Sequence, residues 1–278
     1  MTSRHSNGEN EVPEVPEEPH QIAERAGDVG VERLKRAPLE VLLTAVIGGG
    51  EVSIGALGAM TVLGAALAVA PGLELYTGLA LAAMAFPIGF MFVIMGHSEL
   101  FTENFLIPVV AVLKRERQLS ELAELWALSL AGNLVGCVGM ALLLVGPGAI
   151  GEPIKHGYSA YAEHKLSVQP LGVFLSAVLA GGVMTTLTWL LLSLQDALAR
   201  MLAIFAAGYL LFAANLAHSI VSASVLLVGY SDTGHPLTDV IVWLLIATAG
   251  NMVGGVGLVT LFRVAQAHQQ ADRVTQDK

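Results

Sequence analysis

Long apolar runs separated by short polar segments dominate this chain. A helix needs about 20 mostly apolar residues to cross a bilayer. Six runs reach that length, at roughly 39–69, 77–112, 124–146, 171–194, 200–229 and 238–262. The second and fifth runs are long and contain polar residues, so we expect these two helices to be interrupted. The pattern predicts an all-α integral membrane protein with six transmembrane helices.

Two pairs of segments repeat each other within these runs. Residues 131–139 (AGNLVGCVG) match residues 249–257 (AGNMVGGVG) at seven of nine positions. Residues 41–50 (VLLTAVIGGG) resemble residues 173–182 (VFLSAVLAGG). The first pair relates the third span to the sixth, and the second pair relates the first span to the fourth. The chain therefore consists of two related halves.

Three spans per half decide how the halves are oriented. Because three is an odd number, the second half starts from the other side of the membrane. The repeats 39–146 and 171–263 are then inverted, with a pseudo-twofold axis in the membrane plane. Inverted repeats place their shared site near the bilayer midplane, commonly on discontinuous helices. We expect the site where the second and fifth spans meet.

Composition supports the membrane assignment, and the basic residues predict the orientation. Apolar residues make up 54% and charged residues 13% of the chain, and the mean hydropathy is +0.67; soluble domains carry about 25% charge. The only lysines on one side are Lys155 and Lys165, in a predicted loop at 147–170. The other side holds Arg33, Lys35, Arg36, Lys114, Arg115, Arg117, Arg200, Arg263, Arg273 and Lys278. Both termini are therefore expected on the cytoplasmic side of the cell inner membrane.

The chain ends are expected to lie outside a pore domain at 39–263. Residues 1–38 combine an acidic, proline-containing stretch, which we expect to be disordered, with a short amphipathic helix at 21–36 on the membrane surface. Residues 264–278 are expected to form a second cytoplasmic tail. Lipid is the expected surrounding, and we expect no nucleic-acid partner. The single cysteine, Cys137, excludes an internal disulfide.

A polar island interrupts the second span. A charged group near the bilayer centre costs about 2.5–3.5 kcal/mol on insertion scales, so such groups are rarely incidental. We expect Glu99 to have a structural hydrogen-bonding role. For Glu103 three interpretations remain open: the cytoplasmic surface, a structural hydrogen bond, or substrate contact. The island comprises Gly96, His97, Ser98, Glu99, Leu100, Phe101, Thr102, Glu103, Asn104 and Phe105.

The fifth span contains His218, about halfway along its length. A neutral imidazole can simply bond a backbone carbonyl, and this alternative stays open. Three features favour a functional role: the midplane position, the preceding Asn215, and an alignment of His218–Ser219 with His97–Ser98 in the other half. Imidazole changes its charge nearest neutral pH. His218 can therefore donate a hydrogen bond or a proton to a small anion without carrying a permanent charge.

Two asparagines occupy matching positions of the repeat, Asn133 in the third span and Asn251 in the sixth. Their amides are expected to bond the open backbone of the interrupted helices, although an inter-helix bond unrelated to transport is the alternative. Together with Glu99 and Asn215, they are the expected structural support of the pore. Glu51, in the first span, has no assigned role.

These motifs together resemble the formate/nitrite transporter family. The third and sixth spans carry its Gly-Asn-x-x-Gly, and the resemblance covers about 38–263. In the span-five motif, His-Ser-Ile-Ala-Asn, Val221 and Ser222 depart from the pattern. The residues that fit the two motifs are Gly96, Glu99, Leu100, Phe101, Thr102, Asn104, His218, Ser219 and Ile220.

The resemblance implies an aquaporin-like fold and a homopentamer in which each protomer holds its own pore. It implies two apolar constrictions around a central histidine, which is His218 here, with Thr102 facing it. Leu100 and Phe101 would form the cytoplasmic-side constriction. The implied substrate is a small monovalent anion such as formate or nitrite, carried with a proton and without a cofactor or metal. The implied pore residues are His218, Thr102, Leu100, Phe101, Asn104, Ser219 and Ser222.

Two other functions are weighed against anion transport. A pore for neutral solutes would suit the same fold, but the chain lacks the paired Asn-Pro-Ala motifs of aquaporins. An intramembrane enzyme would need a nucleophile with a base, or clustered metal ligands. His97 and His218 lie in no His-x-x-x-His or Glu-x-x-His spacing that would support a metal. We therefore predict a transporter and not an enzyme.

Overall fold

The structure is a computed structural model that describes residues 18–276. Most of the acidic stretch predicted to be disordered, residues 1–17, lies outside the described residues. Every element within the described part is helical, which confirms the all-α prediction. In chain order the elements are α1 (Pro19–Leu34), α2 (Pro38–Val69), α3 (Leu75–Ala82), α4 (Pro87–Met95), the 3-10 helix η1 (Phe101–Phe105), α5 (Ile107–Leu113), α6 (Leu119–Leu144), α7 (Glu152–Ser167), α8 (Pro170–Ser193), α9 (Ala197–Ala213), α10 (Ser219–Gly229), the 3-10 turn η2 (Tyr230–Asp232), α11 (Leu237–Met252), the π-helical η3 (Val253–Thr260) and α12 (Leu261–Gln276).

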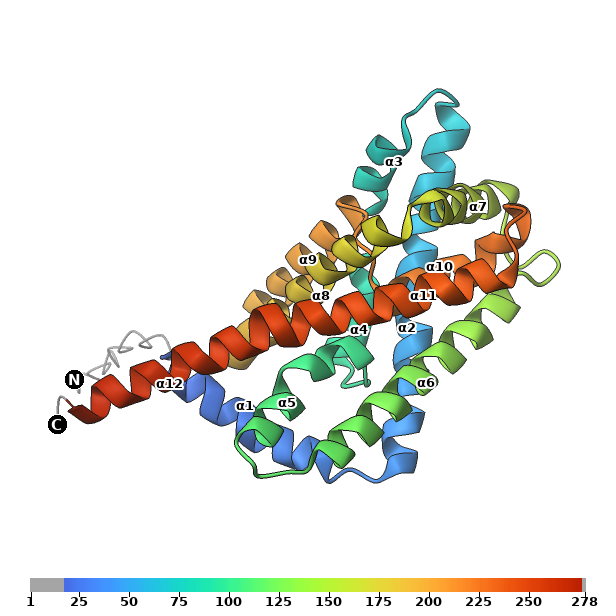
Figure 1. Ribbon diagram of the computed structural model, residues 1–278. Helices are drawn as coiled ribbons and strands as arrows, with labels where there is room; N and C mark the ends of the chain where they lie inside the picture. The colour runs from blue at the N-terminus through green and yellow to red at the C-terminus, as the bar shows by residue number, and fades with distance from the viewer. Residues whose placement is uncertain (1–17, 277–278) are drawn as a thin grey trace, which may run out of the picture.

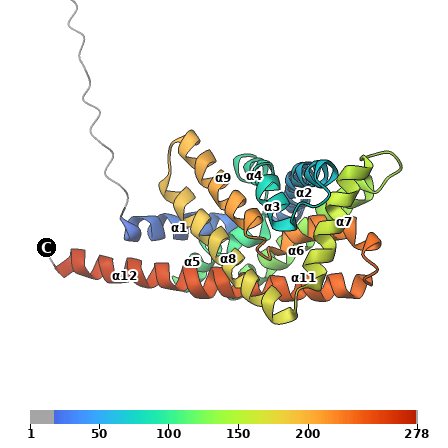
Figure 2. The same cartoon turned by 90° about the horizontal axis from the view of Figure 1, so that it is seen from above.

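Apolar length divides these helices into spanning and shorter ones. Among the described residues, five helices are long and apolar enough to cross a membrane: α2, α3 with α4, α6, α8, and the rod of α11, η3 and α12 up to Arg273. The predicted fifth span is not one of them, because it is split into α9 and α10. The second predicted span is split as well, between α4 and η1. Figure 2 shows α11 and α12 as one continuous rod along an edge of the molecule.

The first helices of the two halves run in opposite directions. Helix α2 begins after α1, and near its far end Gly64 packs against Pro153 of α7. Helix α8 begins directly after α7, and near its end the Leu192 carbonyl accepts a hydrogen bond from Arg25 of α1 (2.6 Å). The two helices therefore connect the α1 end and the α7 end of the molecule in opposite senses (Figure 1).

Helix pairs within each half pack at the repeated glycines. Helix α2 packs on α6, and α8 packs on α11. A Cβ at Gly49 would lie 2.1 Å from the Asn133 carbonyl oxygen, and a Cβ at Gly181 would lie 2.1 Å from the Asn251 carbonyl oxygen. Both distances are far inside van der Waals contact, so only glycine fits. The repeated segments thus make the same close approach in both halves.

One prediction of the sequence analysis is wrong. The segment 147–170 was expected as a loop, but most of it forms α7, which packs on α2 and α10. Its buried side chains Tyr158, Tyr161 and Lys165 recur at helical spacing, while most of its exposed positions are polar. The helix is too short and too polar to be recognised by hydropathy as a span.

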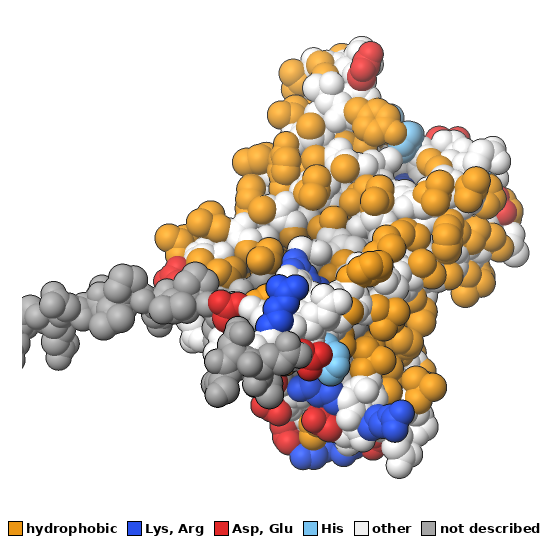
Figure 3. Space-filling model, turned by 60° about the vertical axis from the view of Figure 1, so that its left-hand side comes forward, with side chains coloured by type: hydrophobic (Ala, Val, Ile, Leu, Met, Phe, Trp, Pro, Cys, Tyr) orange, Lys and Arg blue, Asp and Glu red, His pale blue; other side chains and the backbone are white. Residues whose placement is uncertain are grey.

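Charged side chains mark one end of the molecule. We call the end that carries α1, the end of α8 and the α5–α6 turn the terminal face, and the end that carries α7 the opposite face. Helix α1 packs against α5 and α12 there, and Arg117 of the α5–α6 turn donates to the Leu34 carbonyl (3.2 Å). Figure 3 shows charged side chains gathered around this end and apolar side chains over much of the remaining visible surface. Exposed apolar residues on the spans include Leu142, Leu171 and Phe262.

Candidate functional site

The two interrupted spans break in the same way. His97 follows α4 with φ +59°, and Asn215 follows α9 with φ +53°. Beyond each of them the chain closes a six-residue turn, because Ser98 N–H bonds the Val93 carbonyl and Leu216 N–H bonds the Leu211 carbonyl, both at 2.9 Å. This six-residue bond is that of the Schellman ending of a helix, in which the residue before the donor is left-handed. Residues without a Cβ or with a short polar side chain enter that region most readily.

Asn133 and Asn251 hold the broken backbones in place. Asn133 Oδ1 accepts from Phe101 N–H (2.9 Å), and its Nδ2 donates to the carbonyls of Ala45 and Glu99 (both 2.8 Å). The same amide in the other half bonds three equivalent partners. Asn251 Oδ1 accepts from Ser219 N–H (2.9 Å), and its Nδ2 donates to the carbonyls of Ala177 (2.8 Å) and Ala217 (2.9 Å). Both asparagines are fully buried.

These contacts correct the alignment of the two breaks. The shared His-Ser pairs predict a match of His97 with His218. The asparagine bonds instead match Phe101 with Ser219, so that Leu100 corresponds to His218 and His97 to Asn215. The error arose because the alignment followed similar side chains, whereas the repeat preserves the backbone geometry. The two halves therefore present different side chains, one apolar and one imidazole, at equivalent tips.

His218 lies where the two breaks meet. It is fully buried and forms the N-cap of α10, where its Nδ1 accepts from Val221 N–H (3.2 Å). Its Nε2 lies 2.8 Å from Thr102 Oγ1. Because Nδ1 acts as an acceptor, the neutral ring carries its proton on Nε2 and donates it to Thr102. The Phe90 ring lies 5.8 Å from the imidazole, centroid to centroid, so an apolar wall adjoins the pair.

The other predicted pore residues surround this pair to different degrees. Leu100 and Phe101 are buried, the first in the main apolar core and the second edge-on to Phe105 at 5.0 Å. Ser219 and Ser222, in the first turn of α10, are also buried. Their hydroxyl groups have no hydrogen-bond partner among the described residues.

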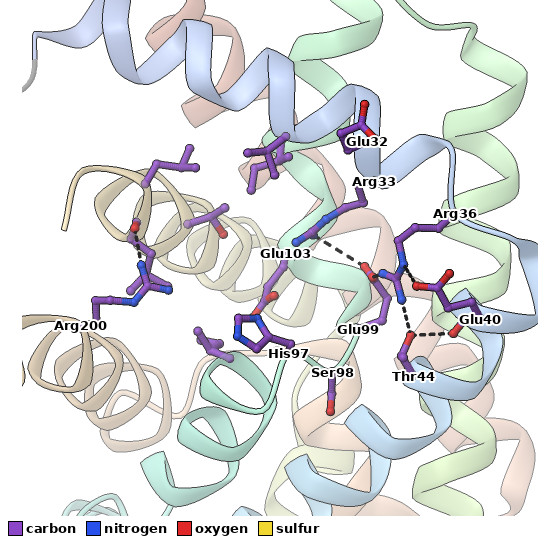
Figure 4. A pocket seen from close by; sticks show the side chains of 16 residues that line it. Glu32, Arg33, Arg36, Glu40, Thr44, His97, Ser98, Glu99, Glu103 and Arg200 are labelled. Atoms are coloured by element: carbon purple, nitrogen blue, oxygen red, sulfur yellow. Dashed lines mark hydrogen bonds and ion pairs between the residues drawn. The ribbon is translucent and has the colours of Figure 1, made fainter. Parts of the chain in front are cut away.

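Glu99 and Asn104 belong to an ionic network on the terminal face, of which Figure 4 shows Glu99, Arg33 and Arg36. The Glu99 carboxylate accepts from Asn104 Nδ2 (2.6 Å) and from Arg36, and Arg33 lies 3.7 Å away. Arg33 also donates to Asn104 Oδ1 (2.8 Å). Both polar atoms of the Asn104 side chain are thus occupied, although the sequence analysis placed this residue in the pore. The arginines were used there only to predict orientation, because nothing in the sequence pairs them with Glu99.

Lys165 is a further residue that the sequence analysis did not single out. It projects from α7, is 2% exposed, and donates to the carbonyls of Asn215 (3.1 Å) and Leu216 (3.0 Å) at the break of the fifth span. Its Nζ also lies 5.2 Å from the Tyr161 ring centroid and 5.5 Å from that of Trp243. Burial lowers the pKa of Lys165 to about 7. The helical spacing of Tyr158, Tyr161 and Lys165 was the available signal.

A cavity of about 600 Å³ opens beside this network on the terminal face. Helix α1 and the end of α8 form part of its wall. Its charged and titratable lining residues are Glu32, Arg33, Arg36, Glu40, His97, Glu99, Glu103 and Arg200 (Figure 4).

Membrane-spanning helices, two matching breaks and a buried polar site between them define a multi-pass membrane transport protein. Comparison with known families identifies the family of transport proteins to which the chain belongs. The family model described as formate/nitrite transporter matches residues 20–265, and the chain belongs to the formate/nitrite transporter family. The family predicted from the sequence motifs is therefore confirmed.

Relatives and solved structures agree with this assignment. The chain is 27% identical over 262 residues to "Uncharacterized transporter YrhG" of Bacillus subtilis (strain 168), covering 91% of this chain and 94% of the relative. It is 28% identical over 241 residues to "Formate-nitrite transporter 3" of Toxoplasma gondii, covering 84% and 48%. A solved "FNT family ion channel" superposes with a TM-score of 0.76 at 21% identity, covering 87% and 96%. A "Pentameric formate channel with formate bound" superposes with a TM-score of 0.65 at 18% identity, covering 82% and 96%. These last two likenesses confirm the fold.

Proposed function

We propose that this protein transports a small monovalent anion, such as formate or nitrite, together with a proton through a pore centred on His218. The single observation that carries the proposal is the pairing of the buried His218 with Thr102 at the meeting point of both broken helices. The names of the Toxoplasma relative and of the pentameric formate channel support the substrate class.

Hydrogen-bond donors at the pore centre can lower the barrier for an anion. A bare anion meets a large desolvation barrier in an apolar pore, and the barrier falls if the anion is neutralised as it passes. The Nε2–H of His218 is a donor that need not hold a permanent charge. The unpartnered hydroxyls of Ser219 and Ser222 add two donors at the positive end of α10. An anion can be bound there briefly and released.

The same proposal includes the assembly and the location of the protein. We expect a homopentamer with one pore in each protomer, as in the named pentameric channel. The excess of lysine and arginine on the terminal face supports a cytoplasmic location for that face and for both termini, in the cell inner membrane. Leu100 and Phe101 would then narrow the pore on the cytoplasmic side of His218.

Labelled formate and nitrite uptake into proteoliposomes, with and without an inward proton gradient, tests this function. His218→Ala is the matched variant. We expect uptake driven by the gradient in the wild type and its loss in the variant. Uptake that ignores the gradient and the histidine, or that favours neutral solutes over anions, would contradict the proposal and favour an aquaporin-like pore for neutral solutes.

A further inference from the structure

Two carboxylates of the second break lie in different surroundings. Glu99 is 3% exposed and is compensated by Arg36, Arg33 and Asn104. Glu103 is one turn further on, in η1, and lines the cavity of the terminal face. Its Oε1 is buried and has no hydrogen-bond partner among the described residues. The first carboxyl group is therefore bonded on both oxygens, whereas the second has a buried oxygen without a partner.

The nearby cations all bond other groups, although Arg33 also interacts electrostatically with Glu103 without forming an ion pair. Arg36 bonds Glu40 and Glu99, and Arg33 bonds Asn104. Arg200 donates to the carbonyl of Leu191 (2.7 Å). No ion pair joins Glu103 to a lysine, arginine or histidine within residues 18–276. In Figure 4 its carboxyl group lies between His97 and Arg33, on the wall of the cavity.

Glu103 also lies next to the pore centre in the chain. Thr102, the preceding residue, contacts His218 Nε2 at 2.8 Å. Glu103 faces the cavity instead. A single turn of 3-10 helix thus links the buried imidazole to a space large enough for water.

We propose that Glu103 is the proton-exchange site at the mouth of the pore on the terminal face. This inference rests on the proposed proton-linked transport of a weak acid HX. The Glu103 carboxylate accepts the proton of HX, so that HX and R–COO⁻ become X⁻ and R–COOH. The carboxyl group then gives the proton to water in the cavity, regenerating R–COO⁻ and forming H₃O⁺. Entry into the pore reverses both steps.

The surrounding charges suit this exchange. Arg33, Arg36 and Arg200 lie along the exit path and draw X⁻ toward water, whereas Glu40 and Glu99 limit how tightly it is held. Once Glu103 has given its proton to water, its carboxylate repels X⁻, because the two carry the same charge. His97, also on the cavity wall, is the remaining titratable group that faces this space. Glu99 cannot replace Glu103, because its oxygens are already bound.

The test compares Glu103→Gln with the wild type, reconstituted as the full chain in proteoliposomes. Formate uptake is measured at equal internal and external pH over a range from about pH 5 to about pH 8. We expect Glu103→Gln to lower uptake about a hundredfold where proton transfer limits the rate and to flatten the pH profile. Glu103→Asp keeps a carboxyl group and is expected to restore the pH dependence at a reduced rate. Glu32→Gln, a change to an exposed acid of the same cavity, serves as the matched control and should behave like the wild type.

The outcomes separate this inference from the proposed function. A Glu103→Gln protein with the wild-type pH profile, or with faster uptake, overturns the inference while the His218 requirement stands; faster uptake would mean that Glu103 is only an electrostatic barrier. A wild type without proton-linked uptake overturns both. Thermal unfolding and native mass of each variant show whether it is assembled. If Glu103→Gln does not assemble, the pH profile of Glu103→Asp decides: a profile like that of the wild type supports the inference, and a flat one overturns it.

Discussion

Replacing Asn251 by alanine removes the support of the fifth-span break. The change removes the two hydrogen bonds of 2.9 Å that Asn251 makes to Ser219 N–H and to the Ala217 carbonyl. Both groups then lose their partner next to a fully buried side chain. The Ala177 carbonyl loses less, because it lies inside α8 and can keep its helical bond. A buried polar group left unpaired costs about 1–3 kcal/mol, so two such groups predict a loss of about 2–6 kcal/mol. Interhelical bonds in membranes average about 0.6 kcal/mol, which favours the lower part of that range.

The matched variant Asn133→Ala makes the prediction sharper. It removes the hydrogen bonds to the equivalent groups, Phe101 N–H (2.9 Å) and the Glu99 carbonyl (2.8 Å), and leaves both groups unpaired. We therefore expect both variants to lower the thermal unfolding temperature of the detergent-solubilised protein by similar amounts. Transport should suffer more in Asn251→Ala, because Ala217 and Ser219 flank His218. Unchanged stability and transport in Asn251→Ala would refute the argument that this amide holds the break together.

Three further changes have defined outcomes. Gly181→Ala places a Cβ 2.1 Å from the Asn251 carbonyl oxygen and should abolish the assembled peak in size-exclusion chromatography, whereas Gly182→Ala, whose nearest neighbour atom is 3.9 Å away, should leave it intact. Arg36→Ala should lower the unfolding temperature. The loss of unfolding free energy should be about 1–3 kcal/mol, because Arg33 still compensates Glu99. Adding Glu99→Gln should recover part of that loss, and no recovery would argue against the ion pair. Burial lowers the pKa of Lys165 to about 7, so its charge destabilises the fold most below that pH, and stability should rise as the pH increases from about 7 toward the ordinary lysine value of about 10.4. Melting curves at about pH 6 and about pH 9 should show this rise in the wild type and not in Lys165→Met.

Sequence patterns predicted the fold better than they predicted the site. Hydropathy is a property of long segments, so the spanning helices could be recognised directly. The repeat at Asn133 and Asn251 could be recognised from the matching residues around them. The position of Thr102 opposite His218 was implied only by family resemblance, because those residues are 116 positions apart. Contacts between distant segments leave no local signal of this kind.

Lys165 and Glu99 show why contacts of the site could not be predicted from the sequence. Lys165 was assigned to a loop, because a helix outside the apolar runs gives no span signal. Glu99 was expected to form hydrogen bonds, but its arginine partner on the connection between α1 and α2 is 63 positions away in the chain. The wrong match of His97 with His218 has a related cause, since side-chain identity is a poor guide where only the backbone contacts are repeated.

The most direct test of the central claim is whether a proton moves with the anion. A pH-sensitive dye is trapped inside proteoliposomes, and a formate gradient is applied with no initial pH difference. The account predicts rapid internal acidification, unaffected by clamping the membrane potential with potassium and valinomycin, and abolished in His218→Ala. Formate entry without acidification, driven by the membrane potential, would show that the bare anion crosses and would contradict the proposed mechanism.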